Sequence, residues 1–279
     1  MPRPKVSLII AFYKDLEALG LIFDALRHQT YKNFEVVVAE DDEAPETKTF
    51  LAKYTDLDIL HVSHPDVGRT KAVAQNRAVC ASTGEYLIFI DGDCIPYTTF
   101  IEGHIFFSAP KRVMSGRRVN LPKRLSEKLR QGSLSSIALE KYFLWYAMSN
   151  LMWNKDTHYE QGFHFNPERR FYNSIITLKS RNTQILGCNF SCHKEDFVAI
   201  NGFDESYGIS ILGDDTDLNW RFKDYGAELK SCKNIANLLH LHHERPKYNH
   251  DPTEHLRRFN ERKAAHQFYC EQGIRQHCS

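Results

Sequence analysis

Short apolar runs alternate with helical periodicity through the first ninety residues of the chain. The runs have the length of strands buried on both faces, and the segments between them repeat apolar residues at helical spacing. The strand candidates are 5–13, 33–40, 57–63 and 86–90, and the helix candidates are 16–26, 47–54 and 71–81. Alternating strands and helices predict right-handed crossovers and an α/β fold, with a mainly parallel central sheet flanked by helices.

The pattern is less regular after residue 110. Residues 112–121 are a further strand candidate, and Leu134 to Trp153 carry leucine and aromatic residues at the spacing of a core helix. Residues 154–174 are polar, aromatic and irregular, which is typical of a loop that faces a substrate. We therefore expect a helical and irregular region beside the sheet.

Composition and charge exclude several classes of protein. The formal net charge of +1 gives no global field for nucleic acid, and no apolar run is long enough to cross a membrane. Seven cysteines at irregular spacings argue against a disulfide framework, so we expect core thiols, Cys188 and Cys192 included, and a reducing, cytoplasmic compartment. Eight basic residues lie between Lys111 and Arg130, against the single acid Glu127. They predict either a solvated face or a surface for anionic lipid or a phosphate-bearing acceptor.

Carboxylates follow two of the predicted strands. Asp91 and Asp93 come after the strand at 86–90, separated by Gly92, which we expect to allow a sharp turn. Glu40 ends the strand at 33–40, and Asp41 follows it. Strands of a parallel sheet end at a common edge where ligands bind, and an Asp-x-Asp pair suits a hard divalent cation. A solvated turn is the alternative interpretation.

Two later clusters offer further chemistry. Asp214 and Asp215 lie at a predicted helix start, where the helix dipole keeps a carboxylate ionised as an N-cap or as a general base. His240, His242 and His243 follow, and on a strand the first two would share a face. A neutral imidazole there is either a packing residue or a ligand for a transition-type divalent ion.

Five segments together resemble a known family. They are "VSLIIAFYKD", "FEVVVAEDD", "GRTKAVAQNRAVCASTGEYLIFIDGDCIP", "GCNFSCHKEDFVAINGFDE" and "GDDTDLNWRF". Their order is similar to that in inverting family 2 glycosyltransferases of the GT-A fold, in particular to the N-terminal module of chondroitin polymerase, over about residues 4–245. The resemblance implies a Rossmann-like domain over 1–245, with a nucleotide-binding half at 1–100, an acceptor-binding half at 101–245 and a C-terminal helical extension at 246–279.

The resemblance also implies roles for individual residues. It implies that the nucleotide sugar is bound by Ala11, Phe12, Tyr13, Glu40, Asp41, Arg69, Lys71, Asn76, Asp91, Gly92, Asp93 and Asn189. It implies that Mn²⁺ or Mg²⁺ is held by Asp93, by Asp91 through water, and by His242, with His240 as the alternative histidine. Asp215 would be the catalytic base, and Asp214 would position the acceptor.

The implied activity is inverting transfer of a hexose or N-acetylhexosamine from a UDP-sugar to a hydroxyl of a glycan or lipid-linked glycan. This would take place in bacterial surface polysaccharide or lipopolysaccharide synthesis, at the inner face of the membrane, with peripheral association through Lys111–Arg130. Residues 121–184 match no family segment and are expected to select the acceptor. A sugar-nucleotide nucleotidyltransferase and a non-catalytic glycan-binding module remain as alternatives.

Overall fold

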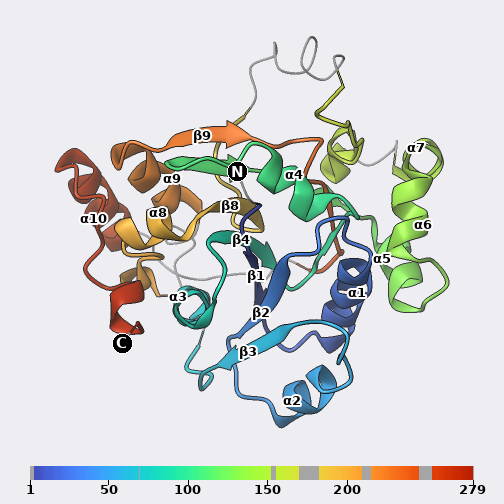
Figure 1. Cartoon of the computed structure of the whole chain (residues 1–279), viewed down its shortest axis with the longest axis horizontal. Helices are drawn as coiled ribbons and strands as arrows, with labels where there is room; N and C mark the ends of the chain where they lie inside the picture. Colours follow the sequence, from blue (N-terminus) through green and yellow to red (C-terminus); the bar gives the residue numbers. More distant parts are fainter. Residues whose placement is uncertain are drawn as a thin grey trace.

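The computed structural model describes residues 3–68, 70–151, 155–169, 182–208, 215–244 and 253–278. Its centre is a seven-stranded sheet in the order β3-β2-β1-β4-β8-β6-β9 (Figure 1). The strands are β1 Val6–Phe12, β2 Phe34–Glu40, β3 Ile59–Ser63, β4 Tyr86–Asp91, β6 Arg112–Ser115, β8 Asn189–His193 and β9 Glu228–Ser231. Within this sheet only β8 is antiparallel to its neighbours. The predicted mixed, mainly parallel sheet is therefore confirmed.

Helices cover both faces of the sheet (Figure 1). They are α1 Leu16–Arg27, α2 Pro45–Leu51, α3 Lys71–Ala81, α4 Phe100–Phe106, α5 Lys123–Arg130, α6 Ser136–Lys141, α7 Phe143–Tyr146, α8 Lys194–Ala199, α9 Asp215–Asp224 and α10 Thr253–Ala264. Because side chains alternate along a strand, Leu8 and Ile10 of β1 pack in the core with α1, α4 and α5. Ile9 faces the other way and packs in the core with α3, α8 and α9.

A second, three-stranded sheet joins distant parts of the chain. It contains β5 Cys94–Pro96, β10 Leu238–His240 and β7 Val119–Asn120, with β10 in the middle. β10 is antiparallel to β5, and His240 lies opposite Cys94. β10 also runs parallel to β7, with His240 opposite Asn120. This small sheet therefore carries His240 to the residue that follows Asp93.

The predicted core helix between Leu134 and Trp153 is corrected by the structure. The segment contains the short helices α6 and α7 followed by a π-helical turn, Ala147–Leu151. Phe143 and Ala147 are buried, whereas the rings of Tyr142 and Trp145 are exposed. The helical spacing was predicted correctly, but only one narrow stripe of this segment faces the core.

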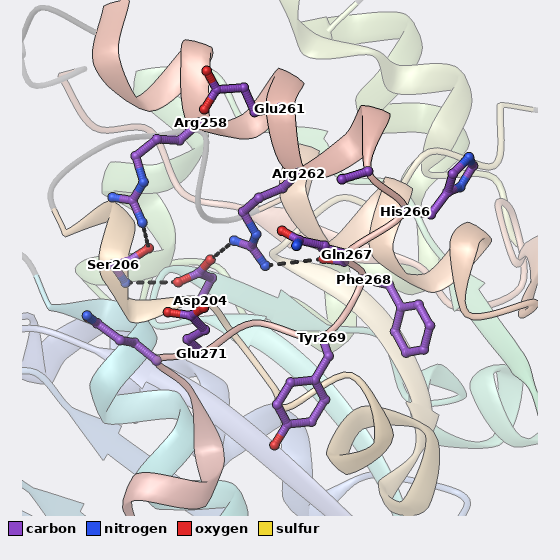
Figure 2. A pocket seen from close by; sticks show the side chains of 12 residues that line it. Asp204, Ser206, Arg258, Glu261, Arg262, His266, Gln267, Phe268, Tyr269 and Glu271 are labelled. Atoms are coloured by element: carbon purple, nitrogen blue, oxygen red, sulfur yellow. Dashed lines mark hydrogen bonds and ion pairs between the residues drawn. The ribbon is translucent and has the colours of Figure 1, made fainter.

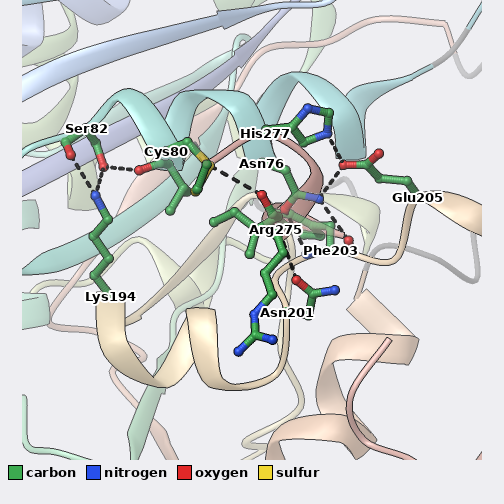
Figure 3. Close-up of a disulfide and its surroundings, with 12 residues drawn as sticks. Asn76, Cys80, Ser82, Lys194, Asn201, Phe203, Glu205, Arg275 and His277 are labelled. Atoms are coloured by element: carbon green, nitrogen blue, oxygen red, sulfur yellow. Dashed lines mark hydrogen bonds and ion pairs between the residues drawn. A yellow bond between two sulfur atoms is a disulfide. The ribbon is translucent and has the colours of Figure 1, made fainter. Parts of the chain in front are cut away.

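The C-terminal segment is joined to helix α3 by a disulfide between Cys80 and Cys278 (Figure 3). Nearby, His277 Nε2 lies 2.7 Å from Glu205 Oε1. The expectation that the cysteines are free thiols is therefore wrong for this pair. The spacing of the cysteines in the sequence does not reveal that these two are bonded. The other five cysteines, Cys94, Cys188, Cys192, Cys232 and Cys270, are buried free thiols, as expected for core positions. The predicted boundary at 245/246 lies outside the described residues.

Candidate active site

The carboxyl ends of β1, β2 and β4 open into a cavity of about 1010 Å³. Parallel pairing sets Ala11 opposite Asp91 and Phe12 opposite Glu40, so these strands end at one edge. Nine residues predicted for the site line this cavity: Ala11, Phe12, Tyr13, Asp41, Lys71, Asp91, Gly92, Asp93 and His242. We call this cavity the cleft.

The two acids of the Asp-x-Asp pair have different partners. Asp91 Oδ1 lies 2.7 Å from Nζ of Lys71, the first residue of α3. Asp93 Oδ2 lies 3.3 Å from His240 Nε2 and 3.2 Å from His243 Nε2. The repulsion between the two carboxylates is therefore offset by a lysine on one side and by two imidazoles on the other.

Asp93 remains ionised in this environment. Burial alone would raise the pKa of its carboxyl, but the hydrogen bonds from His240 and His243 outweigh burial and hold the pKa well below the usual value. The same hydrogen bond to Asp93 raises the pKa of His243. Asp93 is thus a negative centre flanked by two nitrogen donors.

The donor set around Asp93 fits a divalent cation. Ligand atoms of Asp93, Cys94 and His240 lie within 4.8 Å of one another. Burial raises the pKa of the Cys94 thiol well above its usual value, so this sulfur stays protonated and is a poor ligand. Asp93 and His240 remain from this group, and such oxygen and nitrogen donors suit Mn²⁺ and related ions. His243, whose Nε2 lies 3.2 Å from Asp93 Oδ2, adds a further nitrogen donor beside the group.

Of the two histidines that the sequence left open as metal ligands, His240 is the one that contacts Asp93. β10 ends at His240, and Leu241 N donates to Asp93 O at 2.9 Å, so the strand alternation does not extend further. The side chain of His243 therefore contacts Asp93, although an extended strand would have pointed it away from the face of His240 and His242. His242 lines the cleft, and its backbone N–H donates to Ser126 Oγ at 2.8 Å. His240 and His243, not His242, contact Asp93.

Gly92 is required because a side chain would not fit at this position. Its φ lies outside the left-handed region, so the backbone conformation alone does not require a glycine. A Cβ at this position would lie 2.9 Å from the backbone oxygen of Ala11 and 3.4 Å from Phe12 Cα. The amide of Gly92 donates to the same Ala11 oxygen at 2.8 Å. The glycine lies in the turn between β4 and β5, as expected, and it lets the Asp-x-Asp segment cross close to the end of β1.

Asp41 connects the second strand end to α3. Its carboxylate accepts hydrogen bonds from Thr70 N at 2.9 Å and from Thr70 Oγ1 at 2.6 Å. Thr70 immediately precedes Lys71, so Asp41 fixes the start of the helix that carries this cation. Arg69, the other predicted basic residue of this segment, lies outside the described residues.

Asp215 is the first residue of α9 and lies beside Gly187. A Cβ built on Gly187 would come within 2.4 Å of Asp215 Oδ1. Asp215 does not itself line the cleft, but the residue after Gly187 is Cys188, whose Sγ accepts a hydrogen bond from the cleft residue Arg118. The carboxylate is therefore next to the cleft wall, whereas Asp214 lies outside the described residues.

A buried ion pair fixes the helix that begins with Asp215. Arg221 Nη1 lies 3.0 Å from Asp217 Oδ2, and both side chains are fully buried. Tyr207 Oη and Trp220 Nε1 donate to the other oxygen of Asp217 at 3.2 and 3.1 Å. Arg221 Nε also donates to Phe268 O at 2.8 Å, which ties α9 to the C-terminal segment. Because every charged group in this network has partners, it holds α9 in one position.

Three residues predicted to contact the nucleotide sugar are buried elsewhere, which corrects these assignments. Glu40 accepts hydrogen bonds from Thr47 Oγ1 and lies 2.7 Å from His61 Nε2. Asn76 binds the backbone of Phe203 through both its amide nitrogen and its oxygen. Asn189 donates to the backbone oxygens of Arg117 and Ala236 and pairs with His104. The polar atoms of all three support the protein itself, and none of the three lines the cleft.

Sequence reasoning missed several residues of the opposite cleft wall. They include Asp15, Arg118, Asn120, Arg130, Asp156 and His243. Arg130 pairs with both oxygens of Asp15, at 2.9 and 2.7 Å, whereas the described contact of the Arg118 guanidinium is with Cys188 Sγ at 3.4 Å. Arg118 is therefore a cation in the cleft with no carboxylate partner among the described residues. The adjacent pair Arg117-Arg118 within the predicted strand 112–121 was the available signal.

The basic segment Lys111–Arg130 does not form one surface. Three of its arginines are used within the protein: Arg112 pairs with Glu228, Arg118 faces the cleft, and Arg130 pairs with Asp15. Exposed cations of the segment are Lys111 at its start and Lys123 and Arg124 on α5. The predicted contact surface over the whole segment is therefore corrected.

A second cavity of about 600 Å³ lies between α10 and the turn at 204–206 (Figure 2). Arg258 Nη2 donates to Ser206 Oγ at 3.0 Å, and Arg262 pairs with the buried Asp204. No residue predicted for the site lines this cavity. The described contacts there attach α10 to the domain.

Two family models match consecutive parts of the chain. The model described as glycosyl transferase family 2 matches residues 7–172, which is more than half of the chain. The model described as the N-terminal domain of galactosyltransferase matches residues 169–244. The first match ends and the second begins inside the segment 154–174 that the sequence pattern marks as irregular.

Similar proteins include a UDP-Glc:alpha-D-GlcNAc-diphosphoundecaprenol beta-1,3-glucosyltransferase, WfaP, of Escherichia coli. It is 30% identical over 108 residues, 39% of this chain and 43% of that protein. The amylovoran biosynthesis glycosyltransferase AmsB of Erwinia amylovora is 33% identical over 94 residues, 31% of this chain and 30% of that protein. The aligned part thus spans less than half the length of these relatives.

Solved structures agree in fold over nearly the whole chain. TarS 1-349 of S. aureus in complex with UDP-GlcNAc has a TM-score of 0.59 at 15% identity, covering 98% of this chain and 69% of that chain. The mannosyltransferase PcManGT of Pyrobaculum calidifontis, in complex with GDP-Man and Mn²⁺, has a TM-score of 0.54 at 16% identity, covering 95% and 63%. With the family-model match, these likenesses confirm the fold and the resemblance expected from the sequence: the chain belongs to glycosyl transferase family 2 and has the GT-A fold.

Proposed function

We propose that the protein transfers a hexose or N-acetylhexosamine from a UDP-sugar to a hydroxyl of a glycan acceptor, with inversion at the anomeric carbon. The observation that carries the proposal is the pair Asp91 and Asp93 at the strand ends of a cleft, with His240 and His243 at Asp93. The UDP-glucose donor in the name of WfaP and the UDP-GlcNAc in the TarS complex support a UDP-sugar.

The donor diphosphate is proposed to lie between Asp93 and Lys71. Mn²⁺ or Mg²⁺, held by Asp93, His240 and His243 with Asp91 alongside, would supply positive charge that stabilises the leaving diphosphate. Lys71, Arg118 and Arg130 are the protein's own cations among the described cleft residues; Arg130 is paired with Asp15, whereas Arg118 lacks a described carboxylate partner. Fixed positive groups of this kind stabilise a leaving anion without reorganisation.

The proposed base is Asp215. It accepts the proton of the acceptor hydroxyl as that oxygen forms a bond to the anomeric carbon, while the bond from this carbon to the diphosphate oxygen breaks and UDP leaves. The first turn of α9 favours the ionised form of its carboxylate. Asp214 as an acceptor-positioning residue and Arg69 as a nucleotide contact belong to the same proposal.

A panel of UDP-sugars with detection of released UDP tests this function. We expect one donor to give UDP release that depends on an acceptor and is lost in excess chelator. Asp215→Asn should lower kcat by at least 10²-fold with UDP binding unchanged. Asp224→Asn, at the other end of α9, is the matched control and should be near wild type. Wild-type turnover by Asp215→Asn would remove Asp215 from the base role, and full activity in chelator would remove the metal.

The same panel separates the alternative functions. Release of pyrophosphate instead of UDP would identify a nucleotidyltransferase. Binding of a sugar polymer by calorimetry, with no turnover of any nucleotide sugar, would identify a non-catalytic glycan-binding module.

The proposed setting is bacterial surface polysaccharide or lipopolysaccharide synthesis at the cytoplasmic side of the membrane. Such a role is supported by the amylovoran biosynthesis in the name of AmsB and by the diphosphoundecaprenol acceptor in the name of WfaP. Among the described residues no helix is both long and apolar enough to cross a membrane. Rapid alkylation of thiols in intact cells tests the compartment, because a reducing cytoplasm would leave Cys80 and Cys278 reactive.

A further inference from the structure

Large apolar side chains are exposed on one short stretch of the chain. They are Tyr142 (54% exposed), Leu144 (61%), Trp145 (62%) and Met148 (63%). Their spacing of three and four residues places Leu144, Trp145 and Met148 on one side of α7 and the turn that follows it. We call these four residues the α7 face.

The α7 face is presented by a well-packed helix. Phe143, on the opposite side of α7, is buried, and its ring packs edge-on against Phe163 with centroids 5.5 Å apart. A Cβ on Gly162 would lie 2.0 Å from the same ring, which shows how tightly Phe143 is held. The exposure of the α7 face is therefore a property of the folded helix.

The charges around the α7 face are positive. Lys141 is exposed, and its Nζ lies 5.3 Å from the centre of the Tyr142 ring. The single acid of residues 128–151 is Glu140, and its carboxylate turns inward to accept hydrogen bonds from Thr98 N and Oγ1 at 2.9 and 2.7 Å. On α5, the exposed Lys123 and Arg124 outnumber the exposed acid Glu127. The surface thus combines apolar and aromatic groups with a net positive charge.

The same helices border the cleft. Figure 1 shows α5, α6 and α7 together at one side of the molecule, next to α1. Arg130 of α5 lines the cleft, and Ser126 of α5 accepts a hydrogen bond from the backbone of His242, which also lines it. A flat anionic surface resting on the α7 face would therefore lie beside the cleft wall that Arg130 and His242 line.

We propose that the α7 face is a docking surface for an anionic lipid bilayer. The rings of Trp145 and Tyr142 would lie at the level of the headgroups, where an apolar ring with a polar tip is favoured. Leu144 and Met148 would enter the acyl boundary, and Lys141 with the α5 cations would lie near lipid phosphates. The inference rests on the proposed function in one respect: it implies that the acceptor glycan is carried on a lipid in that bilayer.

Vesicle sedimentation of the full chain tests the proposal. The wild type should sediment with vesicles that contain 30% phosphatidylglycerol at least ten times more strongly than with phosphatidylcholine alone. The double variant Leu144→Ser/Trp145→Ser should lose at least tenfold of this binding. Leu256→Ser, which alters an exposed leucine of α10, is the matched control and should bind like wild type. Lys141→Gln should weaken binding to the anionic vesicles alone.

Several results would overturn the proposal. They are absence of vesicle binding by the wild type, and equal binding by the double variant. Concentration-dependent dimerisation that Trp145→Ser abolishes, without vesicle binding, would show a protein interface instead. UDP-sugar turnover with a soluble acceptor is measured separately and should be unchanged in the double variant. Turnover without vesicle binding would therefore refute the proposed docking surface alone. Vesicle binding without any turnover would refute the proposed function alone.

Discussion

Gly187→Ala should disable the proposed base without touching the donor site. The added Cβ would lie 2.4 Å from Asp215 Oδ1, whereas ordinary van der Waals contact begins at 3.4 Å, so the carboxylate must move by about 1 Å. A displacement of that size at a reacting group costs roughly 10²-fold in rate. We therefore expect kcat for UDP release to fall by about this factor, with UDP affinity by calorimetry unchanged.

A double-mutant cycle makes the reasoning specific. If Gly187→Ala acts through Asp215, it should cost little when added to Asp215→Asn, because the group that it displaces is no longer a base. Gly20→Ala, inside α1, is the control: its Cβ would approach the end of the Tyr54 side chain at 3.2 Å, and activity should stay near wild type. Wild-type kcat for a folded Gly187→Ala variant, or full additivity with Asp215→Asn, would refute the assignment.

Three further predictions follow from contacts in the structure. His240→Ala and His243→Ala should each raise the Mn²⁺ concentration needed for half-maximal activity at least tenfold, whereas His242→Ala should leave it near wild type; equal effects of all three would contradict the ligand set. Glu35 is buried, but hydrogen bonds outweigh burial and lower its pKa from 4.5 to about 2, so the stability that it contributes is present above pH 4.5 and is lost as the pH falls toward 2. Urea unfolding should therefore show wild type losing about 2 kcal/mol more than Glu35→Gln between pH 5 and pH 3, and parallel curves would refute this. Cys80→Ser opens a loop of 198 residues and should reduce the free energy of unfolding, measured with urea, by about 2–4 kcal/mol. If wild type with and without reductant unfolds at the same urea concentration, the disulfide does not contribute this stability.

The parts of the fold that were predictable depend on local pattern. The helix expected at 71–81 is α3, Lys71–Ala81, and the run at 86–90 is β4, because these segments carry their own periodicity or a continuous apolar run. The predicted helix at 47–54 instead begins at Pro45, a favoured first helical residue, and ends at Leu51. Boundaries moved, whereas the element types in this part and the mainly parallel character of the sheet followed from the alternation.

The candidate site was predictable in its strand ends and less so in its side-chain directions. Asp91 and Asp93 lie in the cleft because parallel strands end at one edge. Asn76 and Asn189 have the residue type of ligand contacts, but each binds backbone groups from distant segments, and a sequence does not show which way an amide faces. The choice of His243 over His242 depends on where β10 ends, which a long-range pairing decides.

The small sheet of β5, β7 and β10 has a consequence for how the protein folds. The first hundred residues build adjacent parallel strands through nearby crossovers, so half of the cleft can form from contacts that are close in sequence. His240 reaches Asp93 only when β10 pairs with β5, and the buried amide of Asn189 then donates a hydrogen bond to Ala236 O. Loop closure over such separations is slow, so the metal-binding side of the cleft is expected to form last. A chain that has folded only its first half would show an open sheet edge at β4, and this edge is where a stalled intermediate would aggregate.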